Sequence, residues 1–219
     1  MSGAARLLPA GDRAWLLEPA DPAALTAFAR ELEQDAPAGV EDVLPAARTA
    51  LVTLRPGADR DEVARQVLRR WEALPTGDGA GTTDDGDGDG DGDVVTVPVR
   101  YDGEDLEEVA GLLGVGPAEV VARHTGATWT CAFVGFAPGF GYLRGPGARL
   151  AVPRRAQPRT AVPAGAVALA DGWSAVYPRR SPGGWRLIGT TALTLWDPAA
   201  DPPALLRPGT RVRFAQVAG

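Results

Sequence analysis

The stretch AVALADGWSAVYPRRSPGGWRLIG, residues Ala166–Gly189, consists of three short apolar runs separated by glycine and proline. The runs are Ala166–Ala170, Ser174–Tyr177 and Trp185–Ile188. Each run is shorter than an ordinary helix, and turn-forming residues lie between them. Short strands bounded in this way predict a β-barrel or a β-sandwich.

The same character extends through the second half of the chain. Further strands are predicted at Val94–Val99, Ala127–Phe133, Leu193–Trp196 and Val212–Gln216. Two short helices are predicted at Asp105–Leu113 and Pro117–His124, in the outline of a helix-turn-helix. The second helix offers only Glu119 and Arg123 besides its histidine, whereas a DNA-reading helix is basic. We therefore expect the helices to serve packing, and we expect no nucleic-acid partner.

The first half of the chain alternates strands and helices. Strands are predicted at Ala14–Glu18, Val40–Val43 and Ala50–Leu54, and amphipathic helices at about 22–34 and 59–74. The order strand–helix–strand–strand–helix is that of a split βαβ unit. The final strand of this unit is expected to be short, or to come from the part of the chain that lies after the segment Thr76–Asp93.

That segment, Thr76–Asp93, reads TGDGAGTTDDGDGDGDGD and has no apolar residue larger than alanine. Such a composition predicts a flexible linker between two domains, 1–75 and 94–219. The alternative is calcium binding, because Asp85, Asp87, Asp89 and Gly90 match the opening of an EF-hand loop. The twelfth position is Thr96 and not glutamate, so the linker is the favoured interpretation.

Composition narrows the class of protein further. The 219 residues are 45% hydrophobic and carry a net charge of −6, but six of the 28 acidic residues lie between Asp84 and Asp93. Without those six, 22 acids balance 22 arginines, and the chain has no lysine. The N-terminal residues lack a signal-peptide pattern, no apolar run could span a membrane, and Cys131 has no disulfide partner. We expect a cytoplasmic protein that has no membrane partner.

The loop GFAPGFGY, Gly135–Tyr142, combines glycine, proline and aromatic residues at high density. Glycine lets backbone amides approach a ligand, and the aromatic rings could form the wall of a pocket. The residues assigned to this pocket loop are Phe136, Pro138, Gly139 and Phe140. The alternative is a tight loop filled by its own rings.

Arginine is concentrated close to this loop in the sequence. Eight arginines and one acid, Asp171, lie between Arg144 and Arg186. Prolines flank Arg154 and Arg159 and restrict the loop that carries them, and guanidinium groups suit carboxylates and phosphates. We predict that Arg154 and Arg159 contact a small anionic ligand and that Gly183, Gly184 and Trp185 form the opposing wall.

His124 is the only histidine and Cys131 the only cysteine. His124 could act as an acid or base, or it could cap the end of a helix. Cys131 lies inside a predicted strand, where burial is more common than nucleophilic chemistry. One histidine and one cysteine cannot build a structural zinc site, so we expect no tightly bound metal.

Three segments together resemble one family. They are HTGATWTCAFVGFAPGFGYL (His124–Leu143), PRRAQPRTAVPAGAVALA (Pro153–Ala170) and YPRRSPGGWRLIGTT (Tyr177–Thr191). They are similar to the family of 5-oxoprolinase B subunits, also called allophanate hydrolase subunit 1, which includes a sporulation kinase inhibitor and carries a carboxyltransferase domain. Ala166 stands where serine is typical and Ser181 where threonine is typical.

The resemblance implies an α+β fold, with a ferredoxin-like N-terminal domain and a cyclophilin-like β-barrel C-terminal domain. It also implies a component of a hydrolase that acts with the C and A subunits in the ATP-dependent opening of 5-oxo-L-proline to L-glutamate. ATP would be a cosubstrate, with a site shared with the partner, and the isolated chain would be inactive. Within that reaction His124 is the candidate acid–base group.

Two other functions remain open from the sequence. The kinase inhibitor in the family implies that such a protein could instead bind and regulate a histidine kinase. One of the family names implies a component of a urea- or allophanate-degrading system. The motifs do not separate a catalytic role from a regulatory one.

Overall fold

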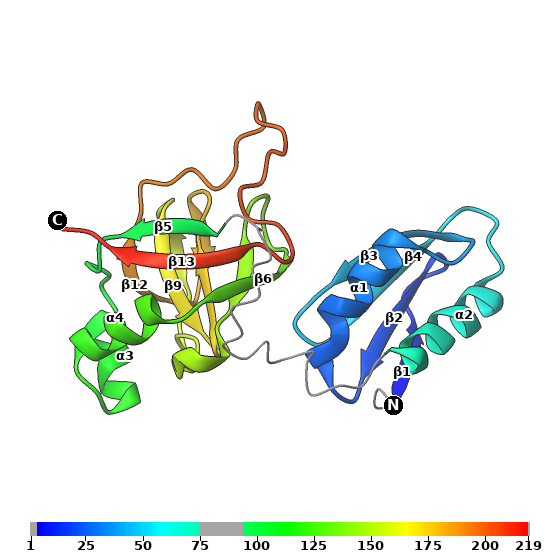
Figure 1. Ribbon diagram of the computed structural model, residues 1–219, viewed down its shortest axis with the longest axis horizontal. Coiled ribbons are helices and arrows are strands. Elements are labelled where there is room, and N and C mark those ends of the chain that lie inside the picture. Colours follow the sequence, from blue (N-terminus) through cyan, green and yellow to red (C-terminus); the bar gives the residue numbers. More distant parts are fainter. Residues whose placement is uncertain (1–3, 75–93, 219) are drawn as a thin grey trace. The chain divides into compact units, whose positions relative to one another are not determined.

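The computed structural model describes residues 4–74 and 94–218. The chain divides into two compact units, residues 1–89 and 90–219 (Figure 1). The predicted linker, and with it most of the candidate calcium loop, lies outside the described residues. The longest described helix has 14 residues, and none of the described helices has the length and apolar character needed to cross a bilayer.

The N-terminal unit is an antiparallel sheet covered by two helices. Its described strands lie in the order β1-β2-β4-β3, with every neighbouring pair antiparallel. The strands are β1 (Ala5–Pro9), β2 (Ala14–Pro19), β3 (Val40–Pro45) and β4 (Ala50–Leu54). A short 3₁₀ turn, η1 (Pro22–Ala24), leads into α1 (Leu25–Gln34), and α2 (Arg60–Ala73) follows β4.

The predicted helices and the split βαβ order are confirmed, but the expected source of the fourth strand is wrong. The sheet position beside β2 is occupied by β1, which precedes the first predicted strand. A tight turn makes this possible, because Gly11 adopts φ 73° and the amide of Ala10 donates to the carbonyl of Ala14. The sheet is thus completed from the N-terminal side and needs no strand from beyond residue 75.

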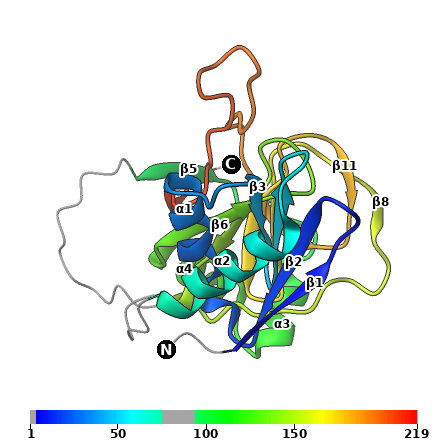
Figure 2. The ribbon, with the colours of Figure 1, turned by 90° about the vertical axis from the view of Figure 1, so that its right-hand side faces the viewer.

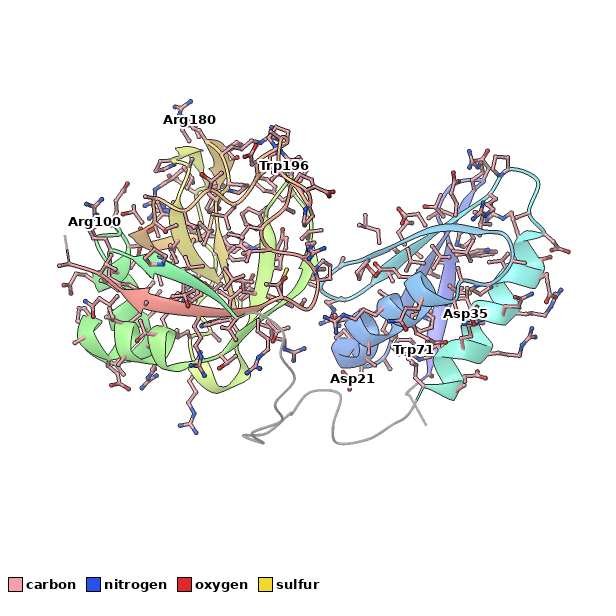
Figure 3. The ribbon with its side chains drawn as sticks, turned by 45° about the horizontal axis from the view of Figure 1, so that its top comes forward. Asp21, Asp35, Trp71, Arg100, Arg180 and Trp196 are labelled. Atoms are coloured by element: carbon pink, nitrogen blue, oxygen red, sulfur yellow. The ribbon has the colours of Figure 1, made fainter. Side chains whose placement is uncertain are left out.

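Both helices pack on one face of this sheet, as Figure 2 shows. Phe28 of α1 and Trp71 of α2 meet edge to face at 5.2 Å, over Leu17 of β2. Asp59 caps α2, since its carboxylate accepts the amides of Asp61 and Glu62 at 3.0 Å. Trp71, labelled in Figure 3, is 1% exposed.

The C-terminal unit is built on a seven-stranded sheet within the described residues. Its strand order is β12-β9-β10-β7-β6-β13-β5. The strands are β5 (Val95–Val99), β6 (Trp129–Val134), β7 (Gly141–Arg144), β9 (Ala166–Ala170), β10 (Trp173–Val176), β12 (Arg186–Thr190) and β13 (Arg211–Gln216). The helices are α3 (Leu106–Leu113) and α4 (Pro117–Gly126), and a 3₁₀ turn, η2, spans Pro146–Ala148. A separate two-stranded sheet is formed by β8 (Arg159–Val162) and β11 (Ser181–Gly183).

The two edges of the sheet meet, so the sheet is a nearly closed barrel. Arg100, which follows β5, exchanges both backbone hydrogen bonds with Thr190 of β12, at 2.8 and 2.9 Å. Gly189 lies at this seam, where an added Cβ would approach the Arg100 carbonyl to 2.5 Å. The barrel predicted from the short strands is confirmed, and a glycine permits its closure.

Side chains of the barrel strands form two separate clusters. On β9, Val167 and Leu169 pack with the helices in the larger core. The alternate residues Ala166, Ala168 and Ala170 belong to a second cluster with Phe140, Tyr177 and Trp185. This alternation is the period of two expected for a strand buried on both faces.

One predicted strand is wrong. Leu193–Trp196 belongs to a long excursion between β12 and β13, and its only pairing among the described residues is a single bridge from Trp196 to Ala204. The sequence interpretation also omitted β1, β7, β8 and β11. Cys131 is buried in β6, as expected for a small apolar side chain.

Candidate functional site

The loop between β6 and β7 is a tight turn that presents one aromatic ring to solvent. The amide of Gly135 donates to the carbonyl of Phe140, and the amide of Phe140 donates to that of Ala137. Phe136 adopts φ 64° and is 59% exposed, whereas Phe140 is 1% exposed. A left-handed, exposed phenylalanine is uncommon and is typical of functional positions.

Gly139 makes this turn possible. Its φ is 78°, and an added Cβ would lie 2.7 Å from the Cβ of Trp196. The turn therefore packs directly against the long excursion that precedes β13, and Pro138 stays exposed beside it. The side chain of Trp196 is partly exposed next to the same turn (Figure 3).

Behind the turn, aromatic rings form a continuous cluster on the outer face of the barrel. Phe140 lies 5.2 Å from Tyr177 and 5.7 Å from Trp185, and Tyr142 lies 5.6 Å from Trp185. Phe136 reaches the cluster through Phe140, at 5.2 Å. Small alanine side chains of β9 and β10 lie under these rings. The structure thus brings Phe136 and Phe140 of the predicted pocket loop together with Trp185, whereas Pro138 and Gly139 lie on the side that faces Trp196 and solvent.

Tyr177 lies at the centre of this cluster, and the sequence interpretation did not single it out. Gly183 packs on its hydroxyl so closely that an added Cβ would lie 2.3 Å from the oxygen. Burial raises the pKa of Tyr177. A backbone hydrogen bond with Trp185 and the charges of Arg154 and Arg159 act in the opposite direction but do not cancel the rise. Gly184 adjoins the same wall and packs beside Pro158.

Arg154 is the cation that remains available on this surface. Its guanidinium carbon lies 6.0 Å from the ring centre of Trp185, and its side chain is 59% exposed. Its Nε donates to the Asp171 carboxylate at 3.2 Å, an exposed contact of small energetic value. An exposed guanidinium beside an aromatic ring can bind a carboxylate or a phosphate.

Arg159, predicted as a second anion contact, is occupied by the protein itself. Its Nη2 lies 2.8 Å from Asp105 and 3.1 Å from Glu104, and its side chain is 15% exposed. Arg155 donates to the same oxygen of Asp105 at 2.7 Å. The two arginines hold the proline-flanked loop against the start of α3, and the charge of Arg159 acts on Tyr177.

Asp105 is the residue that sequence reasoning missed. Burial raises its pKa, but hydrogen bonds from Arg159 and from the amide of Leu187, with the charges of Arg159 and Arg155, hold the pKa below its usual range. The sequence signal was weak, because an aspartate before a helix is usually interpreted as a cap. Here its side chain makes no capping bond and instead anchors a loop about 50 residues away.

His124 lies apart from the aromatic cluster, in the larger core. Its Nδ1 is 2.7 Å from the Tyr101 hydroxyl and its Nε2 is 2.8 Å from the Ser174 hydroxyl. The ring stacks on Phe214 at 4.1 Å and has no exposed surface. Burial lowers its pKa to about 3, so the imidazole is neutral at physiological pH.

Among residues 4–74 and 94–218, no three His, Cys, Asp or Glu side chains are grouped as metal ligands would be. For a phosphate-bearing cosubstrate, the chain offers guanidinium groups and backbone amides, because it has no lysine. Arg154 and the Gly183–Gly184 backbone lie beside the aromatic cluster and could serve.

Comparison with known proteins identifies relatives over most of the chain. The family model for the carboxyltransferase domain, subdomain C and D, matches residues 5–206. The B subunit of the Haemophilus influenzae 5-oxoprolinase is 34% identical over 195 residues, which are 87% of this chain and 84% of that protein. The B subunit of the Bacillus subtilis enzyme is 46% identical over 127 residues, 57% of this chain, and the match spans about half of that relative's length, 53%.

Solved structures show the same fold. The crystal structure of TTHA0988 is 36% identical, with a TM-score of 0.72, and the match covers 94% of this chain but 41% of that one. The K. lactis urea amidolyase matches 99% of this chain and 15% of its own length, with a TM-score of 0.76. At 16% identity, that likeness concerns the fold alone.

Proposed function

The chain belongs to the carboxyltransferase domain family, subdomain C and D, and we propose that it is the B subunit of an ATP-dependent 5-oxoprolinase. The observation that carries the proposal is the match to the B subunit of the Haemophilus influenzae enzyme, at 34% identity over 84% of that protein. We further propose that it acts with the C and A subunits, that it is inactive alone, and that it resides in the cytoplasm.

The proposed reaction opens a lactam ring, which has an unreactive amide carbonyl. Transfer of the terminal phosphoryl group of ATP to the carbonyl oxygen would make the carbon susceptible to water. ADP leaves in this transfer. Addition of one water and cleavage of the ring C–N bond then give γ-glutamyl phosphate with a free amino group, and a second water hydrolyses this acyl phosphate to glutamate and phosphate. We propose that the ATP-binding site is shared with the partner protein, and that this chain binds and orients 5-oxoproline.

The proposed substrate surface is the aromatic cluster with Arg154. The carboxylate of 5-oxoproline would pair with the exposed guanidinium of Arg154, and its flat ring would lie against Phe136, the ring of the cluster that is exposed. Asp105 and Arg159 would act indirectly, because their ion pair fixes the loop that carries Arg154. Gly184 would let the substrate approach the backbone next to β11, whereas Gly183 makes room for the Tyr177 hydroxyl.

The buried position of His124 favours its packing role over the acid–base role that the sequence left open. A general acid or base must come within hydrogen-bond reach of the reacting group, and both ring nitrogens are occupied by hydroxyls in the core. We therefore propose that the proton transfers of the reaction are carried by groups of the partner protein or by water.

The test is ATP hydrolysis with and without 5-oxoproline, measured for the chain alone and reconstituted with homologues of the C and A subunits. We expect no activity alone and 5-oxoproline-dependent hydrolysis in the complex. Arg154→Ala should lower kcat/KM by roughly 10- to 100-fold, the effect of losing one charge-assisted hydrogen bond. Arg180→Ala is the matched control, because Arg180 is exposed and extends away from the barrel (Figure 3).

Two results would contradict the proposal. A reconstituted complex that hydrolyses ATP at the same rate with and without 5-oxoproline would remove the proposed activity. An Arg154→Ala complex with unchanged kcat/KM would leave the activity but remove the proposed substrate surface.

A further inference from the structure

A row of four leucines crosses the N-terminal sheet from edge to edge. In the strand registers, Leu8 is opposite Leu16, Leu16 is opposite Leu51, and Leu51 is opposite Leu44. Residues directly opposite in an antiparallel pair point to the same face of the sheet. The four side chains therefore form one continuous line across β1, β2, β4 and β3.

This line lies on the face opposite the core. The neighbouring residues Leu17 and Val52 point to the other face, where α1 and α2 pack (Figure 2). Leu8 is 39% exposed and Leu44 is 51% exposed, while Leu16 and Leu51 are half-buried. Within residues 4–74, the leucine row is thus an apolar surface that the unit's own helices do not cover. A contiguous exposed apolar surface of this kind marks an interaction site.

The two flanks of the row differ in charge. On one side, an open hollow of about 610 Å³ is lined by Asp12, Glu41 and Asp42, with Arg13 as its only cation. On the other side lie the exposed Arg6–Glu18 ion pair and Arg48, which is exposed in the β3–β4 turn. Asp42 and Arg48 therefore lie on the β3 side of the sheet, at opposite flanks of Leu44.

We propose that this face is the interface of a homodimer, with a second copy of the chain docked face to face on the leucine row. A two-fold axis that runs along the row places each leucine against its equivalent. The same rotation reverses the strand direction, so the flank that carries Arg48 faces the acid-lined hollow of the second copy. Arg48 of each copy then lies opposite Asp42 of the other, as an isologous interface requires.

Charge complementarity is the reason to choose a second copy as the occupant. A basic group on one flank and an acidic hollow on the other complement each other under this symmetry without any further partner. Two antiparallel sheets also pack with aligned strands about 10 Å apart, a spacing that leucine side chains fill. The proposal does not depend on the enzymatic function.

Sedimentation velocity of the full chain at low salt, over a range of concentrations, tests the proposal. We expect a reversible monomer–dimer equilibrium, weakened at high salt because the flanking ion pairs are screened. Leu44→Asp should shift the protein to monomer, since it would place a charge at the more exposed end of the apolar row, opposite the same charge of the second copy. Leu112→Asp is the matched control, because Leu112 is 49% exposed on α3, outside the row, and should leave the dimer intact.

Exchanging the charges at positions 42 and 48 distinguishes loss of the interface from a folding defect, because a misfolded variant would not recover dimerisation when the second charge is also changed. Arg48→Asp alone should weaken the dimer, because it would face the Asp42 carboxylate of the second copy. The double variant Asp42→Arg with Arg48→Asp restores opposite charges across the same axis and should recover dimerisation. Circular dichroism and thermal melting verify that each variant remains folded.

Three outcomes would overturn the proposal. A wild-type chain that stays monomeric at every concentration would show that this face does not join two copies. A dimer that is unaffected by Leu44→Asp would use another surface. A double variant that remains as weak as Arg48→Asp would remove the two-fold arrangement.

Discussion

His124 is a neutral imidazole held between two hydroxyl groups. Neutral imidazole has one N–H donor and one acceptor nitrogen, and a hydroxyl can satisfy either. Tyr101 and Ser174 therefore satisfy the ring completely without a charge. Protonation would add a second N–H and a charge inside an apolar core, which explains why burial lowers the pKa to about 3.

The lowered pKa of His124 predicts an acid-sensitive contribution to stability. In the unfolded chain the histidine takes up a proton near pH 6.5, whereas in the folded protein it does so only near pH 3. The unfolded state thus binds more protons in this interval, and the free energy of unfolding falls as the pH decreases from 6.5 towards 3, by about 1.4 kcal/mol per pH unit for this residue.

His124→Gln should be less stable than the wild type by roughly 1–3 kcal/mol at pH 7, because one buried hydroxyl loses its partner. The deficit should shrink as the pH falls through the interval between 6.5 and 3, since only the wild type loses the histidine contribution. Urea unfolding of both proteins at several pH values measures it. A deficit that stays constant from pH 7 to pH 4 would contradict the interpretation.

At the residue scale, the sequence indicates which side chains are able to bind an anion, but not which of them are already paired within the protein. The pattern around Arg154 and Arg159 is the same, an arginine between prolines, yet one guanidinium is exposed and the other is paired with Asp105. Asp105 lies 54 residues before Arg159 in the chain. The tertiary fold, and not local composition, brings this buried carboxylate to one of the two arginines.

At the scale of elements, most strands and helices were predictable because their apolar periodicity agrees with their burial. The prediction of a strand at Leu193–Trp196 is wrong, and the reason lies in another part of the sheet. The seam between Arg100 and Thr190 already joins the two edges of the sheet, so no edge remains there for another strand. An apolar run alone does not reveal whether a partner strand is free to pair with it.

The seam itself supplies a prediction about the barrel. Gly189→Ala would place a Cβ 2.5 Å from the Arg100 carbonyl and 2.8 Å from Cγ1 of Val99, so the closing hydrogen bonds must lengthen. We expect a loss of about 1–3 kcal/mol, as for other overpacking substitutions, measured by urea unfolding. Gly111→Ala is the control, because no atom lies within 4 Å of its added Cβ, and alanine in the middle of α3 should stabilise by about 0.5–1 kcal/mol. Equal effects of the two substitutions would mean that the seam tolerates a side chain.

At the scale of the whole molecule, the two units have separate hydrophobic cores. One described cluster draws only on residues between Ala5 and Leu74, and the other two draw only on residues from Val95 onward. Division into two domains was predictable from the change in composition along the chain. The sequence did not predict that β1 completes the first sheet. The fourth strand could precede β2 and pair with it in a hairpin, or it could follow α2 and reach the sheet by a crossover. The residues from β2 to α2 have the same pattern in both cases.

Separate cores predict that damage to one unit leaves the other intact. Trp71 is 1% exposed and packs on Phe28, so Trp71→Ala should destabilise the N-terminal unit by roughly 3–5 kcal/mol, the usual cost of a large core cavity. Differential scanning calorimetry should then show one transition moved to lower temperature and a second transition unchanged. The matched substitution Trp129→Ala, at a fully buried tryptophan of the barrel, should move the other transition instead. If either substitution lowers both transitions equally, the two units unfold together, and the expectation of independent stabilities is wrong.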